Sequence, residues 1–151
     1  MTAQPALAGL YPAAILEHSR RPRNRRVLPG WTHSAHSENP ACGDEIAVFL
    51  SIDARGAIAD IAFTGQCCAI ATASASVMTE AVLGKTLDQS KTLAAQFQAM
   101  VTDAAPPPHT GSESGLDSLS TLSAIRDYPA RETCALLAWN TLLLALANPR
   151  G

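Results

Sequence analysis

Large aliphatic residues recur at every second position between residues 45 and 52: Ile46, Val48, Leu50 and Ile52. Successive side chains of a strand point to opposite faces, so this spacing predicts a strand with one strongly apolar face. Residues 53–56 form a turn sequence that ends in glycine, and residues 57–64 return as a second strand. The two segments predict a hairpin, with a weaker third strand over 31–37 at its edge.

Helical patterns flank this hairpin. Pro22 and its neighbours mark the end of the first predicted helix, and Gly84 is a natural stop for the second. The predicted helices cover residues 10–18, 69–83, 87–100 and about 130–147. This order of helix, strands and helices predicts an α+β fold, with a small antiparallel three-stranded sheet and helices packed on one of its faces.

Proline, glycine and serine dominate the segment between the last two of these helices. Residues 104–115 predict an irregular mobile loop, because three consecutive prolines and two glycines break regular structure. Leucine and isoleucine then recur at three-residue spacing over 116–125, which suggests a short amphipathic helix. The chain has no internal repeat, and its 151 residues fit a single domain over 1–151.

The composition excludes several classes of function. A formal net charge of −2, with 16% charged residues, gives no electrostatic case for binding nucleic acid or an acidic membrane. The most apolar run, 135–146, is short for a membrane span and is interrupted by Asn140 and Thr141, so it is interpreted as a core helix. Residues 1–9 lack the features of a secretory signal, and a cytoplasmic location is expected.

Two polar segments have a structural and a functional interpretation. Residues 20–26 carry five arginines in seven positions, which fits either a solvated loop or a docking patch for an acidic protein surface. His33 and His36 are spaced closely enough to share a metal ion, although exposed polar residues are the favoured interpretation. The same interpretation is favoured for Glu38.

The candidate chemistry lies in four cysteines that are far apart in the sequence. Cys42 enters the first strand two residues before Asp44, Cys68 begins a helix, and Cys134 lies in the first turn of the last helix. A helix N-terminus stabilises a thiolate, the form that binds metals and attacks sulfur. Three thiolates and the Asp44 carboxylate would complete a tetrahedral zinc site or anchor an iron–sulfur cluster. Any one cysteine taken alone would more often be a buried core residue.

Three segments resemble the cysteine motifs of the U-type iron–sulfur assembly scaffolds. They are NPACGD at 39–44, FTGQCCAIATASAS at 63–76 and YPARETCA at 128–135. Residues 10–24 also resemble that family's first helix and the Pro-Arg-Asn segment after it, so the resemblance extends from about residue 10 to 147. It implies the U-type scaffold fold.

Within that family the chain is more similar to the SUF-type branch. Cys68 and Cys134 are 66 residues apart, and this long interval resembles that of the SUF-type branch, which carries an insertion there. Thr133 stands where the classical scaffolds have a histidine. The resemblance implies that zinc is bound by Cys42, Asp44, Cys68 and Cys134. It also implies that a pyridoxal-phosphate-dependent cysteine desulfurase donates persulfide sulfur, which passes to downstream iron–sulfur assembly proteins. Such a chain is an accessory carrier, and a transferase only in the stoichiometric sense.

Individual roles follow as hypotheses. Cys134, beside the predicted loop, is the expected sulfur acceptor, and Arg131 is expected to steady the site by pairing with Asp44 or a thiolate. Cys67 stands where the family usually has glycine, so either Cys67 or Cys68 could be the ligand, and the alignment of residues 69–71 favours Cys68. The favoured interpretation of Cys67 is an inert neighbour, and the alternatives are a back-up sulfur acceptor or a partner in oxidative damage. Two alternatives stay open, namely a scaffold that assembles a [2Fe–2S] cluster on the same ligands and a purely structural zinc module.

Overall fold

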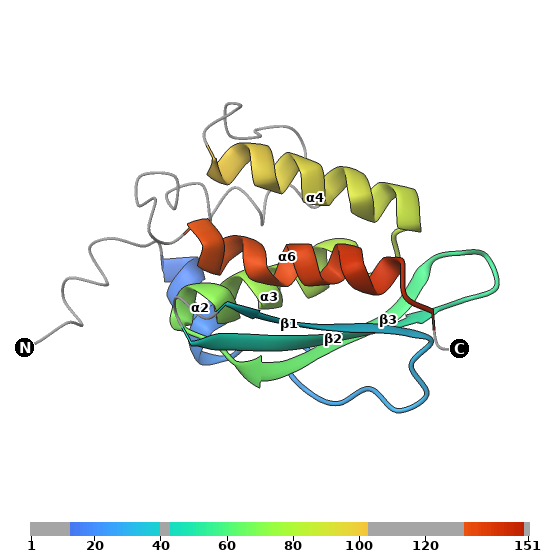
Figure 1. Cartoon of the computed structure of the whole chain (residues 1–151), viewed down its shortest axis with the longest axis horizontal. Helices are drawn as coiled ribbons and strands as arrows, with labels where there is room; N and C mark the ends of the chain where they lie inside the picture. Colours follow the sequence, from blue (N-terminus) through green and yellow to red (C-terminus); the bar gives the residue numbers. More distant parts are fainter. Residues whose placement is uncertain (1–12, 40–42, 103–131, 150–151) are drawn as a thin grey trace, which may run out of the picture.

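The predicted three-stranded sheet is present in the computed structural model, which describes residues 13–39, 43–102 and 132–149. Its strands are β1 (His33–Asn39), β2 (Asp44–Ile52) and β3 (Ile58–Gln66). They pair antiparallel in the order β1-β2-β3, and each lies within two residues of its predicted bounds (Figure 1). The edge strand β1, which has the weakest sequence pattern, is therefore confirmed together with the hairpin.

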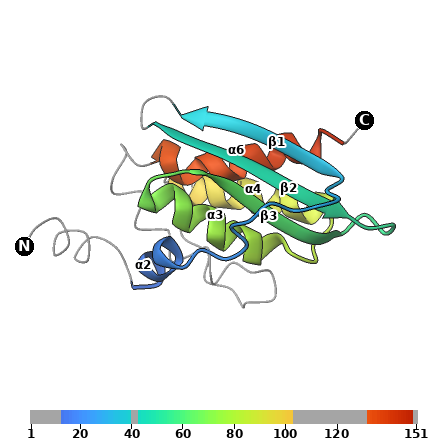
Figure 2. The same ribbon diagram turned by 90° about the horizontal axis from the view of Figure 1, so that it is seen from below.

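The helices lie on one face of this sheet, which confirms the predicted α+β class. They are α2 (Ala13–Arg20), α3 (Ala69–Val82), α4 (Leu87–Val101) and α6 (Glu132–Leu146). The helix α6 packs on β1 and β2, α3 packs beside α6, and α4 lies on the far side of α6 from the sheet (Figures 1 and 2). The helix α2 packs along α3 and ends two residues before Pro22.

The core lies between the sheet and these helices. Ile46, Val48 and Leu50 are fully buried, whereas Glu45, on the opposite face of the strand, is exposed. On the helical side, the rings of Phe97 and Trp139 stack with centroids 5.0 Å apart, which joins α4 to α6. Burying a large aliphatic or aromatic side chain stabilises a fold by about 1.5–3 kcal/mol, so this layer holds the helices against the sheet.

Both edges of the sheet are covered by irregular segments of the chain. Beside β3, the Phe63 N–H donates to the Asn24 carbonyl over 3.0 Å, and the Arg26 N–H donates to the Phe63 carbonyl over 2.9 Å. Beside β1, the Asn148 side-chain amide donates to the Ser34 carbonyl over 2.8 Å. Exposed strand edges invite pairing with other chains, so these contacts protect the sheet.

Small hydroxyl side chains of α3 connect it to its neighbours. The Ser76 hydroxyl accepts a hydrogen bond from the Arg23 N–H over 2.8 Å and is hydrogen bonded with His18 Nδ1 over 2.7 Å. Burial, with the nearby Arg23 charge, lowers the pKa of His18, so the neutral imidazole is favoured beside the hydroxyl. These contacts hold α2 and the segment after it against α3.

Two sequence predictions stay untested by this structure. The proline-rich loop at about 104–115 and the short helix at 116–125 lie outside the described residues, so the single-domain organisation over 1–151 stays a prediction. Within the part of the chain that is described, no helix has the length and apolarity needed to cross a membrane.

Replacing Gly65 by alanine should destabilise the fold more than the same change at Gly84. Both glycines have positive φ, +136° and +84°, but an added Cβ at Gly65 would collide with the Glu45 carbonyl oxygen and lie 2.8 Å from Ile46 Cα. No atom lies within 4 Å of the corresponding position at Gly84. We expect G84A to cost about 1 kcal/mol from backbone strain alone and G65A at least about 3 kcal/mol. Equal losses in urea unfolding would contradict this account of β3.

Candidate metal centre

Asp44 is a buried carboxylate that the strand alternation places on the helical face of the sheet. It precedes Ile46 by two residues in β2, so its side chain points to the same side, and it is only 4% exposed. Its Oδ1 accepts a hydrogen bond from the Cys68 N–H over 2.8 Å. Its other oxygen, Oδ2, has no hydrogen-bond partner in the described part of the chain. Among the described residues, one oxygen of the buried Asp44 carboxylate thus has a hydrogen-bond donor and the other has none.

Cys68 caps the N-terminus of α3, where the sequence predicted a strand-to-helix junction. Its backbone is extended, with φ −64° and ψ 171°, and its Sγ accepts a hydrogen bond from the Ala71 N–H over 3.4 Å. The first amides of a helix carry a partial positive charge, so the Cys68 sulfur lies where helix amides can donate hydrogen bonds to it. Cys68 is half-buried, so its sulfur lies between the core and the surface.

Cys134 lies close to Asp44 and Cys68, on helix α6. It is the third residue of α6, as the sequence predicted, and it is fully buried. One atom each from Asp44, Cys68 and Cys134, a carboxylate oxygen and two sulfurs, lie within 4.8 Å of one another. The first residues of β2, α3 and α6 all lie at the left end of the molecule in Figure 1. The fold therefore brings together three of the four predicted ligands.

The donor set suits a thiophilic metal. Tetrahedral zinc with thiolate and carboxylate ligands separates those atoms by about 3.5–3.8 Å, which small side-chain adjustments here would reach. An unpaired buried carboxylate oxygen is costly, and a cation bound there would remove that cost. Two residues of the predicted site, Cys42 and Arg131, lie outside the described residues, so their predicted roles stay predictions.

Cys67 differs from its neighbour in its surroundings. Its Sγ donates a hydrogen bond to the Glu45 carbonyl over 3.3 Å. Burial, followed by the nearby Asp44 charge, raises the pKa of Cys67 to about 11. A neutral thiol committed to a backbone carbonyl is a poor ligand and a poor nucleophile, which agrees with the interpretation of Cys67 as an inert neighbour.

The rim of the site joins β1 to α6. The Asn39 side-chain amide donates to the Thr133 hydroxyl over 3.3 Å, and Thr133 is exposed beside the buried Cys134. Asn39 lies directly across from Asp44 in the sheet register. Thr133, the residue before Cys134, therefore contributes a hydroxyl that contacts the end of β1.

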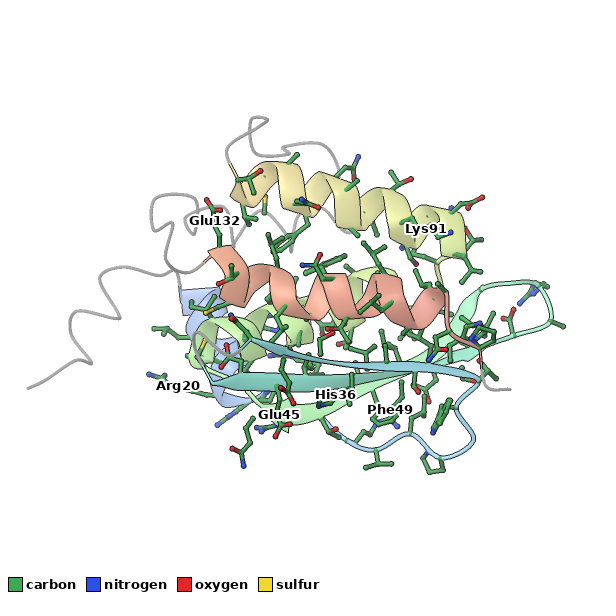
Figure 3. All side chains as sticks on the ribbon, viewed as in Figure 1. Arg20, His36, Glu45, Phe49, Lys91 and Glu132 are labelled. Carbon is green, nitrogen blue, oxygen red and sulfur yellow. The ribbon has the colours of Figure 1, made fainter. Side chains whose placement is uncertain are left out.

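The two histidines of β1 do not share a site. They are three residues apart in a strand, so they project from opposite faces, and His33 Nδ1 is hydrogen bonded with the Thr32 hydroxyl over 2.9 Å. His36 instead lies on the sheet face opposite the helices, 3.3 Å from Glu45 Oε1 (Figure 3). Glu38 forms an exposed group with His36 and Glu45, and the potential ligand atoms of these three residues lie within 4.8 Å of one another. Sequence analysis missed this group because it depends on the register that places Glu38 opposite Glu45.

Much of the arginine-rich segment is engaged within the molecule. Arg26 pairs with Asp60 at 2.8 Å, Arg25 donates to the Gly65 carbonyl over 2.9 Å, and Arg23 lies 3.6 Å from Glu80. These contacts favour the interpretation as a structured surface segment over a patch of five unengaged charges.

A small antiparallel sheet, helices on one face, and a buried carboxylate close to two cysteines at helix N-termini are the features that form this candidate metal centre. The sequence from residue 10 to 135 matches the NifU-like N terminal domain, and the chain belongs to this family. The membership agrees with the resemblance of its three cysteine motifs.

Named relatives span nearly all of the chain. It is 37% identical to the iron-sulfur cluster assembly scaffold protein IscU of Streptococcus pyogenes serotype M1, over 91% of this chain and 82% of that protein. It is 31% identical to the zinc-dependent sulfurtransferase SufU of Bacillus subtilis strain 168, over 94% and 92%. A crystal structure of a putative iron-sulfur cluster assembly scaffold protein for the SUF system from Fervidobacterium islandicum AW-1 superposes with a TM-score of 0.80, at 27% identity over 91% and 97%.

The variant D44N should be more stable than the native chain without metal and less stable than the native chain when zinc is added. Without metal, we expect D44N to be more stable by about 1 kcal/mol, because its amide oxygen still accepts from the Cys68 N–H while a buried charge is removed. At zinc concentrations about 100 times the dissociation constant, the native chain gains about 2.7 kcal/mol and the variant gains less.

Urea unfolding with a chelator and with zinc measures both differences. The matched control is D60N, which changes a carboxylate that pairs with Arg26 on the exposed side. Zinc that stabilises the native chain, D44N and D60N equally would show that Asp44 is no ligand.

Proposed function

We propose that this chain acts in iron–sulfur cluster biogenesis as a zinc-bound acceptor of persulfide sulfur from a cysteine desulfurase. The observation that carries the proposal is the buried Asp44 carboxylate: one of its oxygens lies within 4.8 Å of the sulfurs of Cys68 and Cys134, and its Oδ2 has no hydrogen-bond partner among the described residues. Cys42, two residues before Asp44 in the sequence, is the proposed fourth ligand. Membership of the NifU-like N terminal domain family and relatives named as assembly scaffolds support the general role.

The sulfur-transfer branch is favoured by local features of the site. A relative named as a zinc-dependent sulfurtransferase shares 31% identity with nearly the whole chain. Thr133 offers a hydroxyl, which is a weak metal ligand, and it is hydrogen bonded to Asn39. Four protein ligands would then be three thiolates and one carboxylate, a set that holds zinc without any change of oxidation state.

The proposed reaction is a thiol exchange. The Cys134 thiolate attacks the terminal sulfur of the desulfurase persulfide, a new sulfur–sulfur bond forms on Cys134, and the desulfurase cysteine leaves as its thiolate. The atoms and electrons balance without an external oxidant, because the persulfide sulfur is already at the required oxidation level. Zinc, when bound, supplies electrostatic stabilisation of the thiolates, and Arg131 is proposed to pair with Asp44 or with a thiolate.

Burial sets a condition on this reaction. Cys134 is fully buried in the first turn of α6, so its sulfur becomes reachable only when this turn moves relative to α3 or to the sheet. Thr133, which is exposed and whose hydroxyl accepts a hydrogen bond from the Asn39 side chain over 3.3 Å, is the adjacent contact that must open. We therefore propose that docking of the desulfurase loosens this end of α6.

A scaffold that assembles a [2Fe–2S] cluster on the same ligands is the second candidate. It is favoured by the 37% identity to a relative named as a cluster assembly scaffold, and the oxygen ligand Asp44 would hold iron less firmly than a thiolate. A purely structural zinc module is the third candidate, and the burial of Cys134 is consistent with it.

Metal analysis after anaerobic purification, combined with a desulfurase turnover assay, separates the three candidates. We expect about one zinc per chain and a clear stimulation of turnover by a partner desulfurase. Iron with acid-labile sulfide would favour the scaffold instead. Zinc without any stimulation would favour the structural module, and either result would overturn the proposed sulfur transfer.

Persulfide should accumulate on Cys134 when the chain is incubated with desulfurase and cysteine. Peptide mass spectrometry after alkylation locates the added sulfur, and C134S should abolish it while C67S leaves it unchanged, because Cys67 is committed to the Glu45 carbonyl. Persulfide confined to Cys42 or Cys68 would refute the assignment of Cys134 as acceptor.

A further inference from the structure

We infer that Ser74 is a positioning residue of the metal centre, which sets the placement of Cys134 relative to Cys68. The inference concerns the site of the proposed function and rests on it for the role of the metal, but the geometric part can be tested without metal. Ser74 is not itself a ligand, because its hydroxyl is engaged with the backbone of α6.

The contact is a short hydrogen bond between the two helices that carry the cysteines. Ser74 Oγ in α3 donates to the Ala135 carbonyl in α6 over 2.6 Å, across 61 residues of sequence. Ser74 and Ala135 are both fully buried, so water does not compete for either group. A buried hydroxyl to carbonyl bond is directional, and it restricts sliding and rotation in a way that contacts between apolar side chains do not.

The position of this bond couples it to the separation of the two cysteine sulfurs. Ala135 directly follows Cys134, and Ser74 lies six residues after Cys68, about 9 Å along the axis of α3. A shift of the first turn of α6 along α3 would therefore stretch this bond and change the separation of the two sulfurs together.

The other hydroxyls of α3 point to different partners. Thr72 donates to the Cys67 carbonyl over 3.3 Å, and Ser76 contacts Arg23 and His18. These bonds tie α3 to the segment before it and to α2. Among the described residues, Ser74 is the hydroxyl of α3 that hydrogen bonds to α6, so the helix that Cys68 caps is held on both sides.

Removing the hydroxyl should cost metal affinity while leaving the fold intact. In S74A the Ala135 carbonyl keeps its place within the α6 backbone ladder, and alanine suits the middle of a helix. Loss of groups that orient metal ligands typically lowers metal affinity about 10–100-fold. We expect zinc, measured by competition with a chromophoric chelator, to bind S74A at least about 10-fold more weakly than the native chain.

Thr141 provides a matched control. Its hydroxyl is also fully buried and donates to a carbonyl, that of Leu137, over 2.7 Å, but this bond lies within α6 and away from the cysteines. T141V should therefore lower thermal stability by an amount similar to S74A and bind zinc as the native chain does. Zinc affinity that is unchanged in S74A, or equally reduced in both variants, would overturn the inference.

Thiol alkylation of the metal-free protein separates this inference from the proposed function. A small alkylating reagent should modify Cys134 faster in S74A than in the native chain or T141V, as measured by peptide mass spectrometry, because the buried sulfur is reached only when the first turn of α6 moves. If the native chain binds no zinc yet this difference is found, the metal site fails and the positioning role stands. Equal rates of Cys134 alkylation in all three proteins would overturn the positioning role whatever the metal result.

Discussion

The hydrogen bond from the Cys68 amide to Asp44 Oδ1 is the interaction on which the site depends. It joins the first residue of β2 to the N-terminus of α3 across 24 residues of sequence, at a distance of 2.8 Å. Because Asp44 is buried by the alternation of β2, its charge must be compensated by groups that the fold supplies. The amide at the helix start compensates one oxygen. The remaining oxygen has no partner among the described residues, and the carboxylate lies within 4.8 Å of two sulfurs, so the stability of this corner and its affinity for a cation are linked.

The packing of the helices brings the two cysteines to Asp44 and so forms the candidate metal centre. Both α3 and α6 begin at the same end of the sheet, so their amide dipoles and the two cysteines converge on Asp44. The ring stack of Phe97 on Trp139 anchors the middle of α6, while Ser74 and Asn39 hold its first turns from two sides. A buried thiol at the end of a helix that is anchored elsewhere can become exposed without unfolding of the core.

The same fold is compatible with more than one activity, and the relatives illustrate this. Proteins named as cluster scaffolds and a protein named as a zinc-dependent sulfurtransferase are all about one third identical to this chain. Fold therefore does not decide between them, and the decision lies in the residues around the ligands. Here these are Thr133 beside Cys134, Cys67 with its hydrogen bond to Glu45 beside Cys68, and the contact between Ser74 and α6.

Local sequence patterns were sufficient for the elements of this protein. The period of two in β2, the glycine after α3 and the apolar run of α6 each reflect neighbours in sequence, and the strands and helices follow them closely. The same patterns placed Cys68 at a helix start and Cys134 in a first helical turn, because those positions depend only on where each element begins.

Tertiary structure decided how those elements meet. The pairing of Asp44 with the Cys68 amide, the turning of Cys67 toward Glu45, the separation of His33 from His36 and the bond from Ser74 to α6 all join or divide residues through register and packing. Such contacts arise from the balance of burial and hydrogen bonding over the whole fold, which no short window of sequence contains. The amino-acid sequence by itself determined which thiols and carboxylate were available, and the packing of two helices on one sheet determined which of them face each other.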